Sequence, residues 1–286
     1  MITVNCISLA DEHARRDYMR AQLDACGLPY RFFDAVRIDL ARGLPESYAR
    51  QRRLRHSGVD MRAGEMGCYL SHREIWKAFL AGSDALCLVL EDDVEIGPDF
   101  AAVVTALCAD TRDWEFVRLT GVFRRTAFPL RRLAGEHFLV DYLEQPNGTQ
   151  GYLLNRRAAR RLVDYTADMA HAIDMAIDRE WEHGVNIMGV APGPISHQEN
   201  FETTLGSAPK PRLSLRQKLM RELHRAGGNI GKQLFLARKR RRLTRNRDNR
   251  RVQYAKRIAP LAAHERQWFM GRWCNALSLI TPYESN

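Results

Sequence analysis

The sequence lacks the signatures of several common protein classes. Neither GxGxxG nor GxxxxGK[ST] occurs in its 286 residues, which argues against dinucleotide-binding and P-loop folds. No run approaches the roughly 20 apolar residues that a membrane-spanning helix needs. The N-terminus also lacks the basic and long apolar regions of a signal peptide. The six cysteines form no CxxC pair and no regular framework, so we expect buried thiols in a reducing compartment. These absences predict a soluble, cytoplasmic protein.

Acidic residues are scarce at one end of the chain. Positions 210–257 hold 18 Lys or Arg against two carboxylates, a net charge of +16 within a chain of net charge +10. The rest of the chain is therefore mildly acidic. A positive field confined to one segment indicates a separate role for that segment.

The first 36 residues predict a strand, a helix and a second strand. Residues 2–8 and 30–36 are strand-like, and 11–25 has helical spacing that Gly27 ends. Such a βαβ unit favours an α/β fold with a mostly parallel sheet. After an irregular segment over 37–61, the pattern predicts helices over 64–81, 98–109, 155–165 and 174–184. It predicts strands over 86–90, 115–119, 137–141, 152–154 and 185–190.

A run of five apolar residues, Leu86 to Leu90, ends in three consecutive carboxylates, Glu91, Asp92 and Asp93. An apolar run of this length between breakers is typical of a strand buried on both faces. Unpaired carboxylates are costly to bury, and a divalent cation at the strand end would compensate them. Oxygen ligands of this kind suit Mg²⁺ or Mn²⁺. The alternative is a solvated acidic turn.

The composition changes near residue 206. Pro209 and Pro211 interrupt the pattern, and a strongly basic helical pattern follows over 213–243. We therefore expect a catalytic domain over 1–205 and a basic, mainly helical C-terminal region over 206–286. The basic region could be a solvated helix, a nucleic-acid-binding segment or a membrane-surface segment. It has few aromatic residues for base stacking, so we expect no nucleic acid and favour contact with an anionic membrane through 210–257.

Five motifs occur in the order typical of one family. They are Val4–Leu9 followed by Arg15-Arg16, then 32–36 (FFDAV), then 64–72 (GEMGCYLSH) with Trp76, then 88–94 (LVLEDDV), and finally 148–152 (GTQGY) followed by Ile173-Asp174 and 194–198 (PISHQ). Over residues 2–205 the chain resembles glycosyltransferase family 25, the lipopolysaccharide and lipooligosaccharide galactosyltransferases. It departs from the family at its first strand, where 5–9 reads NCISL in place of a segment with Ile-Asn-Leu-Asp. That departure leaves the nucleotide contacts of this strand open.

The resemblance implies a GT-A-like fold whose acidic motif holds Mn²⁺ (or Mg²⁺) against the diphosphate of a UDP-sugar. The implied metal ligands are Asp93 and Glu91, with Asp92 as the alternative to Glu91. His197, in a loop rich in Pro and Gly, is the candidate that completes the set. The residues expected to contact the nucleotide-sugar are Ser8, Arg15, Ser71, His72, Glu91, Asp92 and Gln150. Structural alternatives exist for several: Arg15 as a solvated side chain, Ser71 bonded to backbone, His72 as a helix histidine, and the segment around Gln150 as a plain turn.

Asp174 and Asp178 lie four residues apart on the predicted helix and so share a face. An inverting transfer needs a general base for the acceptor hydroxyl, and Asp174 is the first candidate, with Asp178 the second. The alternative for Asp174 is a helix N-cap.

The sequence thus predicts an inverting, metal-dependent glycosyltransferase that moves galactose from UDP-galactose to a lipooligosaccharide or lipopolysaccharide acceptor. It would work at the inner face of the cytoplasmic membrane, with a glycolipid as its acceptor. The alternatives are a glucosyl- or N-acetylhexosaminyltransferase of the same fold, a non-catalytic sugar-nucleotide-binding protein, and a basic nucleic-acid-binding protein.

Overall fold

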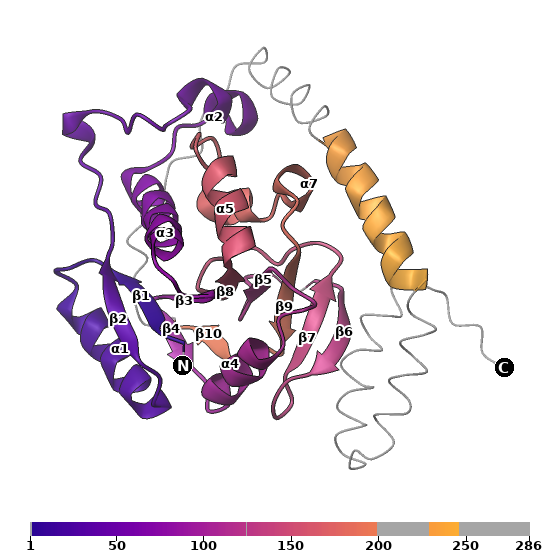
Figure 1. Cartoon of the computed structure of the whole chain (residues 1–286). Helices are drawn as coiled ribbons and strands as arrows, with labels where there is room; N and C mark the ends of the chain where they lie inside the picture. The colour runs from indigo at the N-terminus through magenta and orange to yellow at the C-terminus, as the bar shows by residue number, and fades with distance from the viewer. Residues whose placement is uncertain (1, 124, 199–228, 246–286) are drawn as a thin grey trace.

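A mixed eight-stranded sheet forms the centre of the protein (Figure 1). The structure is a computed structural model that describes residues 2–123, 125–198 and 229–245. Across the sheet the strands follow the order β2(Tyr30–Asp34), β1(Val4–Ser8), β3(Leu86–Glu91), β8(Gly151–Asn155), β5(Phe116–Arg118), β9(Ile187–Ala191), β7(Phe138–Tyr142) and β6(Ala127–Arg132).

Most strands of this sheet point in one direction. β1 is parallel to both β2 and β3, and β5 is parallel to β9. β8 runs against β3 and β5, and β7 runs against β9 and β6. Only β8 and β7 therefore oppose the other strands of the sheet. This confirms the expected α/β fold with a mostly parallel sheet, and the βαβ unit at its start.

Helices cover both faces of the sheet, which gives three layers (Figure 1). α1(His13–Cys26) and α4(Phe100–Ala109) pack on one face, and α3(Ala63–Ala81) and α5(Arg156–Tyr165) on the other. The central strand β3 shows why. Leu88 and Leu90 face the α1/α4 core, whereas Cys87 and Val89 face the α3/α5 core, because successive side chains of a strand point to opposite faces. β3 is thus buried on both sides, as its continuous apolar run predicts.

Local sequence signals fix several helix ends. Gly27 follows α1 in the left-handed conformation, with φ of 65°, and its amide donates to Asp24. Asn155 caps α5 by accepting a hydrogen bond from the amide of Ala158 at 2.9 Å. Gly67 allows α3 to approach the chain after β2, since a Cβ at this position would lie 2.3 Å from the carbonyl oxygen of Val36.

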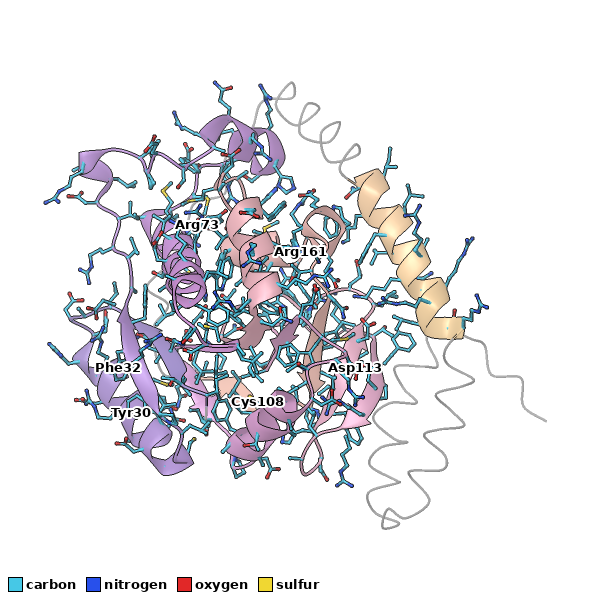
Figure 2. All side chains as sticks on the ribbon, in the orientation of Figure 1. Tyr30, Phe32, Arg73, Cys108, Asp113 and Arg161 are labelled. Atoms are coloured by element: carbon cyan, nitrogen blue, oxygen red, sulfur yellow. The ribbon has the colours of Figure 1, made fainter. Side chains whose placement is uncertain are left out.

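Figure 2 labels Tyr30 and Phe32 on the edge strand β2 and Arg161 on α5. On the edge strand β2, the rings of Tyr30 and Phe32 pack edge to face with centroids 6.0 Å apart, and Arg16 lies over Phe32. Arg161 of α5 donates to the carbonyl of Gly184 and so ties α5 to the start of the segment that leads into β9. These contacts link α1 to β2, and α5 to the segment that leads into β9.

Five elements were not expected from the sequence, and one of them is the short 3₁₀ helix η1(Leu40–Arg42). α2(Arg50–Ser57) lies inside the segment predicted to be irregular, and β6 is an edge strand that contains Pro129, where the missing N–H disrupts no inner ladder. β4(Val94–Ile96) pairs antiparallel with β10(Ile195–His197) in a separate small sheet.

The predicted helix over 174–184 is wrong as one element. It is two short helices, α6(Ile173–Ile177) and α7(Glu180–His183), because the backbone of Arg179 leaves the helical region with ψ of 53°.

Part of the basic C-terminal region is a helix over 229–245 that packs on the main body (Figure 1). Lys239 is 5% exposed and contacts both Glu180 at 2.9 Å and Asp141 at 3.2 Å, while Arg242 pairs with Asp141. Leu243 is fully buried beside them. Within the described residues, this helix is anchored by buried charges. The rest of the region, with most of the predicted 213–243 helix, lies outside the described residues.

Two further findings concern membrane-spanning helices and cysteines. No helix in the described part of the chain is long and apolar enough to cross a membrane. The five cysteines that the structure describes are free thiols; Cys6 and Cys87 are buried as expected, whereas Cys26, Cys68 and Cys108 are only partly buried.

Candidate functional site

A cavity of about 500 Å³ opens at the carboxyl ends of β1 and β3. Its wall combines the end of β1, the first turn of α1, the N-terminal half of α3 and the three carboxylates that follow β3. In α/β sheets, ligands bind in the crevice at the carboxyl ends of the strands. The residues that line it include Ser8, Arg15, Ser71, His72, Glu91, Asp92 and Asp93. The fold thus gathers seven of the predicted site residues at one cavity.

The three consecutive carboxylates have three different environments. Glu91 accepts hydrogen bonds from His72, at 3.2 Å, and from the hydroxyl of Thr149. Asp92 forms an ion pair with Arg15 at 2.9 Å, in which both side chains are largely buried. Burial acts to raise the pKa of Glu91, but its bonds to His72 and Thr149 outweigh burial and leave the pKa below its usual range. Asp93 is the carboxylate without such compensation.

Among the three carboxylates, Asp93 is the one that a bound cation would stabilise most. Its Oδ1 atom is buried and has no hydrogen-bond partner among the described residues. Burial, followed by the charge of Glu91, raises the pKa of Asp93 to about 6. A buried carboxylate of this kind is stabilised by a divalent cation, which favours the ionised form. The residues therefore fit a metal of the predicted type.

His197 lies beside Asp93, with Nδ1 3.7 Å from Oδ2. The small β4–β10 sheet makes this approach, because β4 directly follows the acidic run and His197 pairs with Val94. The amide of Gln198 also donates to the carbonyl of Asp93 at 2.8 Å. Two segments about a hundred residues apart in sequence are thereby held together at the cavity rim.

The described residues also contain a cluster that sequence analysis did not single out. Ligand atoms of Cys68, His72 and Glu91 all lie within 4.8 Å of one another. However, burial raises the pKa of the Cys68 thiol well above its usual value, and both ring nitrogens of His72 are already bonded, to Tyr152 at 2.7 Å and to Glu91. This set is therefore a weaker candidate for a metal than Asp93 and its neighbours.

The predicted nucleotide contacts divide into two groups. Ser71 is fully buried, donates to the carbonyl of Gly67 at 2.7 Å and accepts from the amide of Val36, so its hydroxyl is used by the fold. Ser8 is also buried, and its hydroxyl donates to the carbonyl of Leu9 at 3.4 Å. His72 and Arg15 instead hold carboxylates of the acidic run. Gln150 has a buried Oε1 without a described partner, and its backbone carbonyl accepts from the amide of Glu91.

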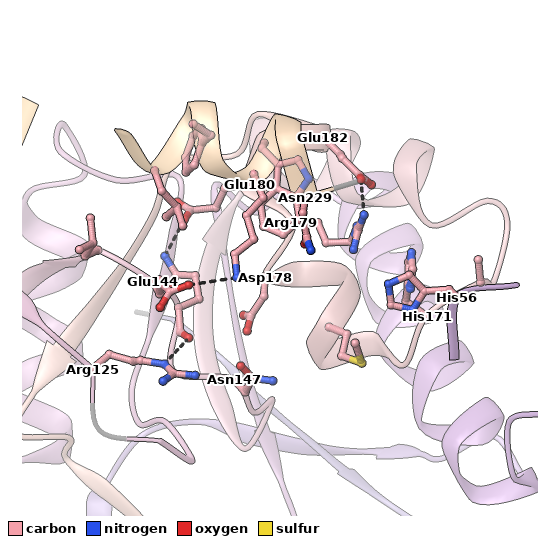
Figure 3. A pocket seen from close by; sticks show the side chains of 18 of the residues that line it. His56, Arg125, Glu144, Asn147, His171, Asp178, Arg179, Glu180, Glu182 and Asn229 are labelled. Carbon is pink, nitrogen blue, oxygen red and sulfur yellow. Dashed lines mark hydrogen bonds and ion pairs between the residues drawn. The ribbon is translucent and has the colours of Figure 1, made fainter. Parts of the chain in front are cut away.

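A second cavity, of about 830 Å³, borders the segment 147–150 at Asn147 (Figure 3). Asn147 and Asp178 line it, whereas Thr149 in the same segment bonds Glu91 of the first cavity. Asp174 is not among the described residues that line either cavity, and its carboxylate accepts from the amide of Met175. Asp174 is not an N-cap, since Ala172 occupies that position. Of the two aspartates, Asp178 is the one that faces a cavity.

Asp178 forms an ion pair with Arg118, a side chain only 1% exposed. Arg118 also donates to the carbonyl of Gly148, so one guanidinium ties Asp178 to the segment 147–150. Burial raises the pKa of Asp178 above its usual range, against the lowering effect of Arg118. The pair holds a largely buried carboxylate in a fixed position.

Sequence reasoning missed Arg118, Thr149 and Tyr152. Tyr152 bonds the ring of His72 and accepts from Trp76 at 3.0 Å, which fixes the ring that holds Glu91. A signal existed for Arg118, because a charge inside the otherwise apolar strand 115–119 must find a buried partner. Thr149 and Tyr152 lie within the 148–152 motif, but the motif does not reveal their partners, which lie far away in sequence.

Comparison with known proteins agrees with this geometry. The family model described as Glycosyltransferase family 25 (LPS biosynthesis protein) matches residues 1–177. The chain therefore belongs to glycosyltransferase family 25. The resemblance read from its motifs is confirmed.

Three relatives show the range of the family. Lacto-N-neotetraose biosynthesis glycosyltransferase LgtE of Neisseria meningitidis serogroup B is 30% identical over 277 residues, which cover 84% of this chain and 92% of that protein. Procollagen galactosyltransferase 1-A of Xenopus laevis is 27% identical over 172 residues, or 55% of this chain. A human relative named Inactive glycosyltransferase 25 family member 3 is 32% identical over 130 residues, which cover 40% of this chain and 20% of that protein. The chain spans only about a quarter (27%) of the length of the Xenopus protein and of a similar mosquito (Aedes aegypti) relative.

Proposed function

We propose that this protein is an inverting, metal-dependent glycosyltransferase with a GT-A-like fold that transfers galactose from UDP-galactose to a lipooligosaccharide or lipopolysaccharide acceptor. The observation that carries this proposal is Asp93, a buried carboxylate whose Oδ1 lacks a partner at the cavity on the strand ends. The bacterial relative LgtE, matched over most of both chains, supports a lipooligosaccharide acceptor, and the procollagen galactosyltransferases support galactose.

We assign Asp93, His197 and Glu91 as the residues that would hold Mn²⁺ or Mg²⁺. When bound, the metal would neutralise charge on the departing diphosphate. Arg15 holds Asp92 away from this set through their ion pair, which leaves Asp93 as the principal ligand. Thr149 and His72 both bond Oε1 of Glu91, so its carboxylate is positioned before any ligand arrives.

Asp178 is our choice of general base, ahead of Asp174. Its carboxylate lines the second cavity, from which an acceptor hydroxyl could approach the donor on the face opposite the leaving group. Burial raises the pKa of Asp178, which brings it nearer to the pH at which a base works best. Arg118 acts as a positioning residue, because it fixes Asp178 relative to Gly148.

The test of the reaction is release of UDP by the full chain from a panel of UDP-sugars, with and without Mn²⁺ and with glycolipid extract as acceptor. Manganese-dependent release with a preference for UDP-galactose supports the proposal. A preference for UDP-glucose or an N-acetylated donor would correct the sugar. Binding of UDP without release from any donor would instead support a non-catalytic sugar-nucleotide-binding protein, in line with the name of the human relative.

Contact with an anionic membrane surface remains part of the proposal. In the described helix 229–245, Lys232, Lys239 and Arg242 are engaged in ion pairs with the body, so they are not free for lipid. Other basic side chains of the helix stay exposed, namely Arg238, Arg240, Arg241 and Arg245. Vesicle co-sedimentation tests this, and equal binding to neutral and anionic vesicles at low salt would count against it.

A further inference from the structure

The second cavity is built from parts of the chain that are distant in sequence, and α2 contributes Arg52 and His56 to it. The segment 143–147 forms one wall, α7 with the residues around it forms another, and the helix 229–245 closes the third (Figure 3). Its volume of about 830 Å³ falls within the range of small-molecule sites. None of the described residues that line the first cavity, and none of the proposed metal ligands, lines this second cavity.

The carboxylates that line this cavity are matched within the protein, whereas the lining cation Arg125 donates to the carbonyl of Gln145 and has no carboxylate partner among the described residues. Each of its four carboxylates has a basic partner: Glu144 with Lys232 at 3.0 Å, Asp178 with Arg118, Glu180 with Lys239 at 2.9 Å, and Glu182 with Arg179. A carboxylate that already has its counter-charge has little to gain from a cationic ligand, and a paired cation has little to gain from an anionic one. With its carboxylates matched and one lining cation, Arg125, left without a carboxylate, the cavity suits a neutral ligand rich in acceptor oxygens.

Several of its polar atoms nevertheless have no described partner. The indole N–H of Trp181 and the Nε–H of Arg179 are buried donors without an acceptor, and Oε1 of Gln145 is a buried acceptor without a donor. Gln145 is only 5% exposed, and its amide nitrogen is already held by Glu180 and the carbonyl of Ile187. Buried polar groups are normally hydrogen-bonded, so these atoms indicate that a ligand completes them.

His171 adds a further group of the same kind. Its Nδ1 is buried without a described partner, and burial lowers the pKa of His171 to about 3, so the ring is neutral near pH 7. The residues that line the cavity thus include both donors and acceptors without a described partner. A hydroxyl group both donates and accepts, and a saccharide presents several hydroxyls on one rigid ring.

We propose that this second cavity binds the neutral saccharide end of the acceptor, and that the helix 229–245 completes it. This inference rests on the proposed transfer reaction, since the bound hydroxyl must reach Asp178. The segment 147–150 would then separate donor from acceptor: Asn147 lines the acceptor cavity, while Thr149 holds Glu91 in the donor cavity.

The helix contributes to this cavity as a fixed wall. Lys239 and Arg242 anchor it through Glu180 and Asp141, and the side chains of Lys232, Phe235 and Leu236 face the cavity. A different helix sequence at these positions would change the shape of the cavity and leave the nucleotide cavity untouched. The basic C-terminal region therefore includes a determinant of acceptor choice.

The first test uses Trp181→Phe, which removes one N–H and keeps a ring for the Arg179 and Lys232 side chains that lie over it. The matched control is Trp114→Phe, in the core, where the indole N–H already donates to the carbonyl of Asp110. Binding of lactose, maltose and N-acetyllactosamine to the full chain is measured by saturation-transfer NMR, and binding of UDP by calorimetry. We expect Trp181→Phe to weaken saccharide binding by about 3- to 10-fold, the effect of one hydrogen bond. Trp114→Phe should leave it unchanged, and UDP affinity should not move in either variant.

The second test asks whether the helix 229–245 shapes the cavity. Phe235→Ala enlarges the cavity, whereas Leu234→Ala changes an exposed residue of the same helix that does not line it. Only Phe235→Ala should alter the order of preference among the three saccharides. Absence of saturation transfer from every neutral saccharide, binding of glucose 6-phosphate alone, or equal binding by wild type and Trp181→Phe would each overturn the proposal. A wild-type protein that binds saccharide but not UDP would instead refute the proposed transfer reaction, so the two failures are distinguishable.

Discussion

Replacement of Arg118 by Met tests a largely buried ion pair at the site. Arg118 is 1% exposed and Asp178 15% exposed, so the variant leaves a largely buried carboxylate without its counter-charge. Removal of one partner from a buried pair costs about 3–5 kcal/mol. Asp178 retains some contact with water, so we expect a loss of about 3 kcal/mol in the free energy of unfolding at pH 8.

Asp178→Asn completes a thermodynamic cycle. The single variant leaves the Arg118 charge buried, whereas the double variant leaves neither charge unpaired. The double variant should therefore be less destabilised than the sum of the two single variants, by about 2 kcal/mol. Urea denaturation of the four proteins, followed by linear extrapolation, gives each free energy of unfolding.

The pH dependence of Arg118→Met provides a second check. Without Arg118 the pKa of Asp178, already raised by burial, should rise further, so the folded state binds a proton more tightly than the unfolded state. Stability contributed by that proton is present at low pH and lost as the pH rises through the folded-state pKa. The gap between wild type and Arg118→Met should thus be smaller at pH 5 than at pH 8. Additive single variants and a gap independent of pH would together refute this account of the pair.

Three further predictions follow from other contacts. Asp93→Asn should lower turnover by about 10²-fold or more, on the scale of one charge-stabilising group. The same change should raise the thermal midpoint of the metal-free protein, because burial already disfavours the Asp93 anion; a lowered midpoint would contradict this. Burial lowers the pKa of His183 to about 4, below its unfolded value near 6.5, so its contribution to stability is lost as the pH falls from about 7 toward 4. His183→Gln should flatten the stability profile by at most about 1.4 kcal/mol per pH unit over that range, and an unchanged slope would count against the assignment. Lys239→Met should cost about 3–5 kcal/mol in denaturant unfolding, since Glu180 and Asp141 lose a shared buried partner, while Arg240→Met on the exposed side of the same helix should be neutral within about 0.5 kcal/mol.

The parts of the fold that sequence predicted are those encoded by local patterns. The apolar run before Glu91 has the length and flanks of a doubly buried strand, and β3 is one. The βαβ unit at the start of the chain was equally predictable, because a segment with helical spacing lies between two strand-like segments. α2 was not, since its sequence is almost wholly basic and its helix depends on tertiary contacts such as that of Arg53 with the carbonyl of Val59.

The candidate site was only partly predictable for the same reason. The acidic run identified one wall of the first cavity, and His72 and Arg15, two of the predicted site residues, also line it. The second cavity could not be foreseen, because it depends on pairs such as Lys239 with Glu180, which are 59 residues apart. Long-range pairing of this kind has no periodicity or motif that marks it in a single sequence.

The measurement that tests the central claim most directly is UDP affinity with and without Mn²⁺, for the wild type, Asp93→Asn and Glu95→Gln. Glu95 is an exposed carboxylate two residues further along, bonded only weakly to Ser196, and serves as the matched control. We predict that Mn²⁺ increases the affinity of the wild type and of Glu95→Gln for UDP by at least about 10-fold, and that Asp93→Asn loses this increase. Equal manganese-dependent affinity in all three proteins would show that the metal does not bind at Asp93 and would contradict the account.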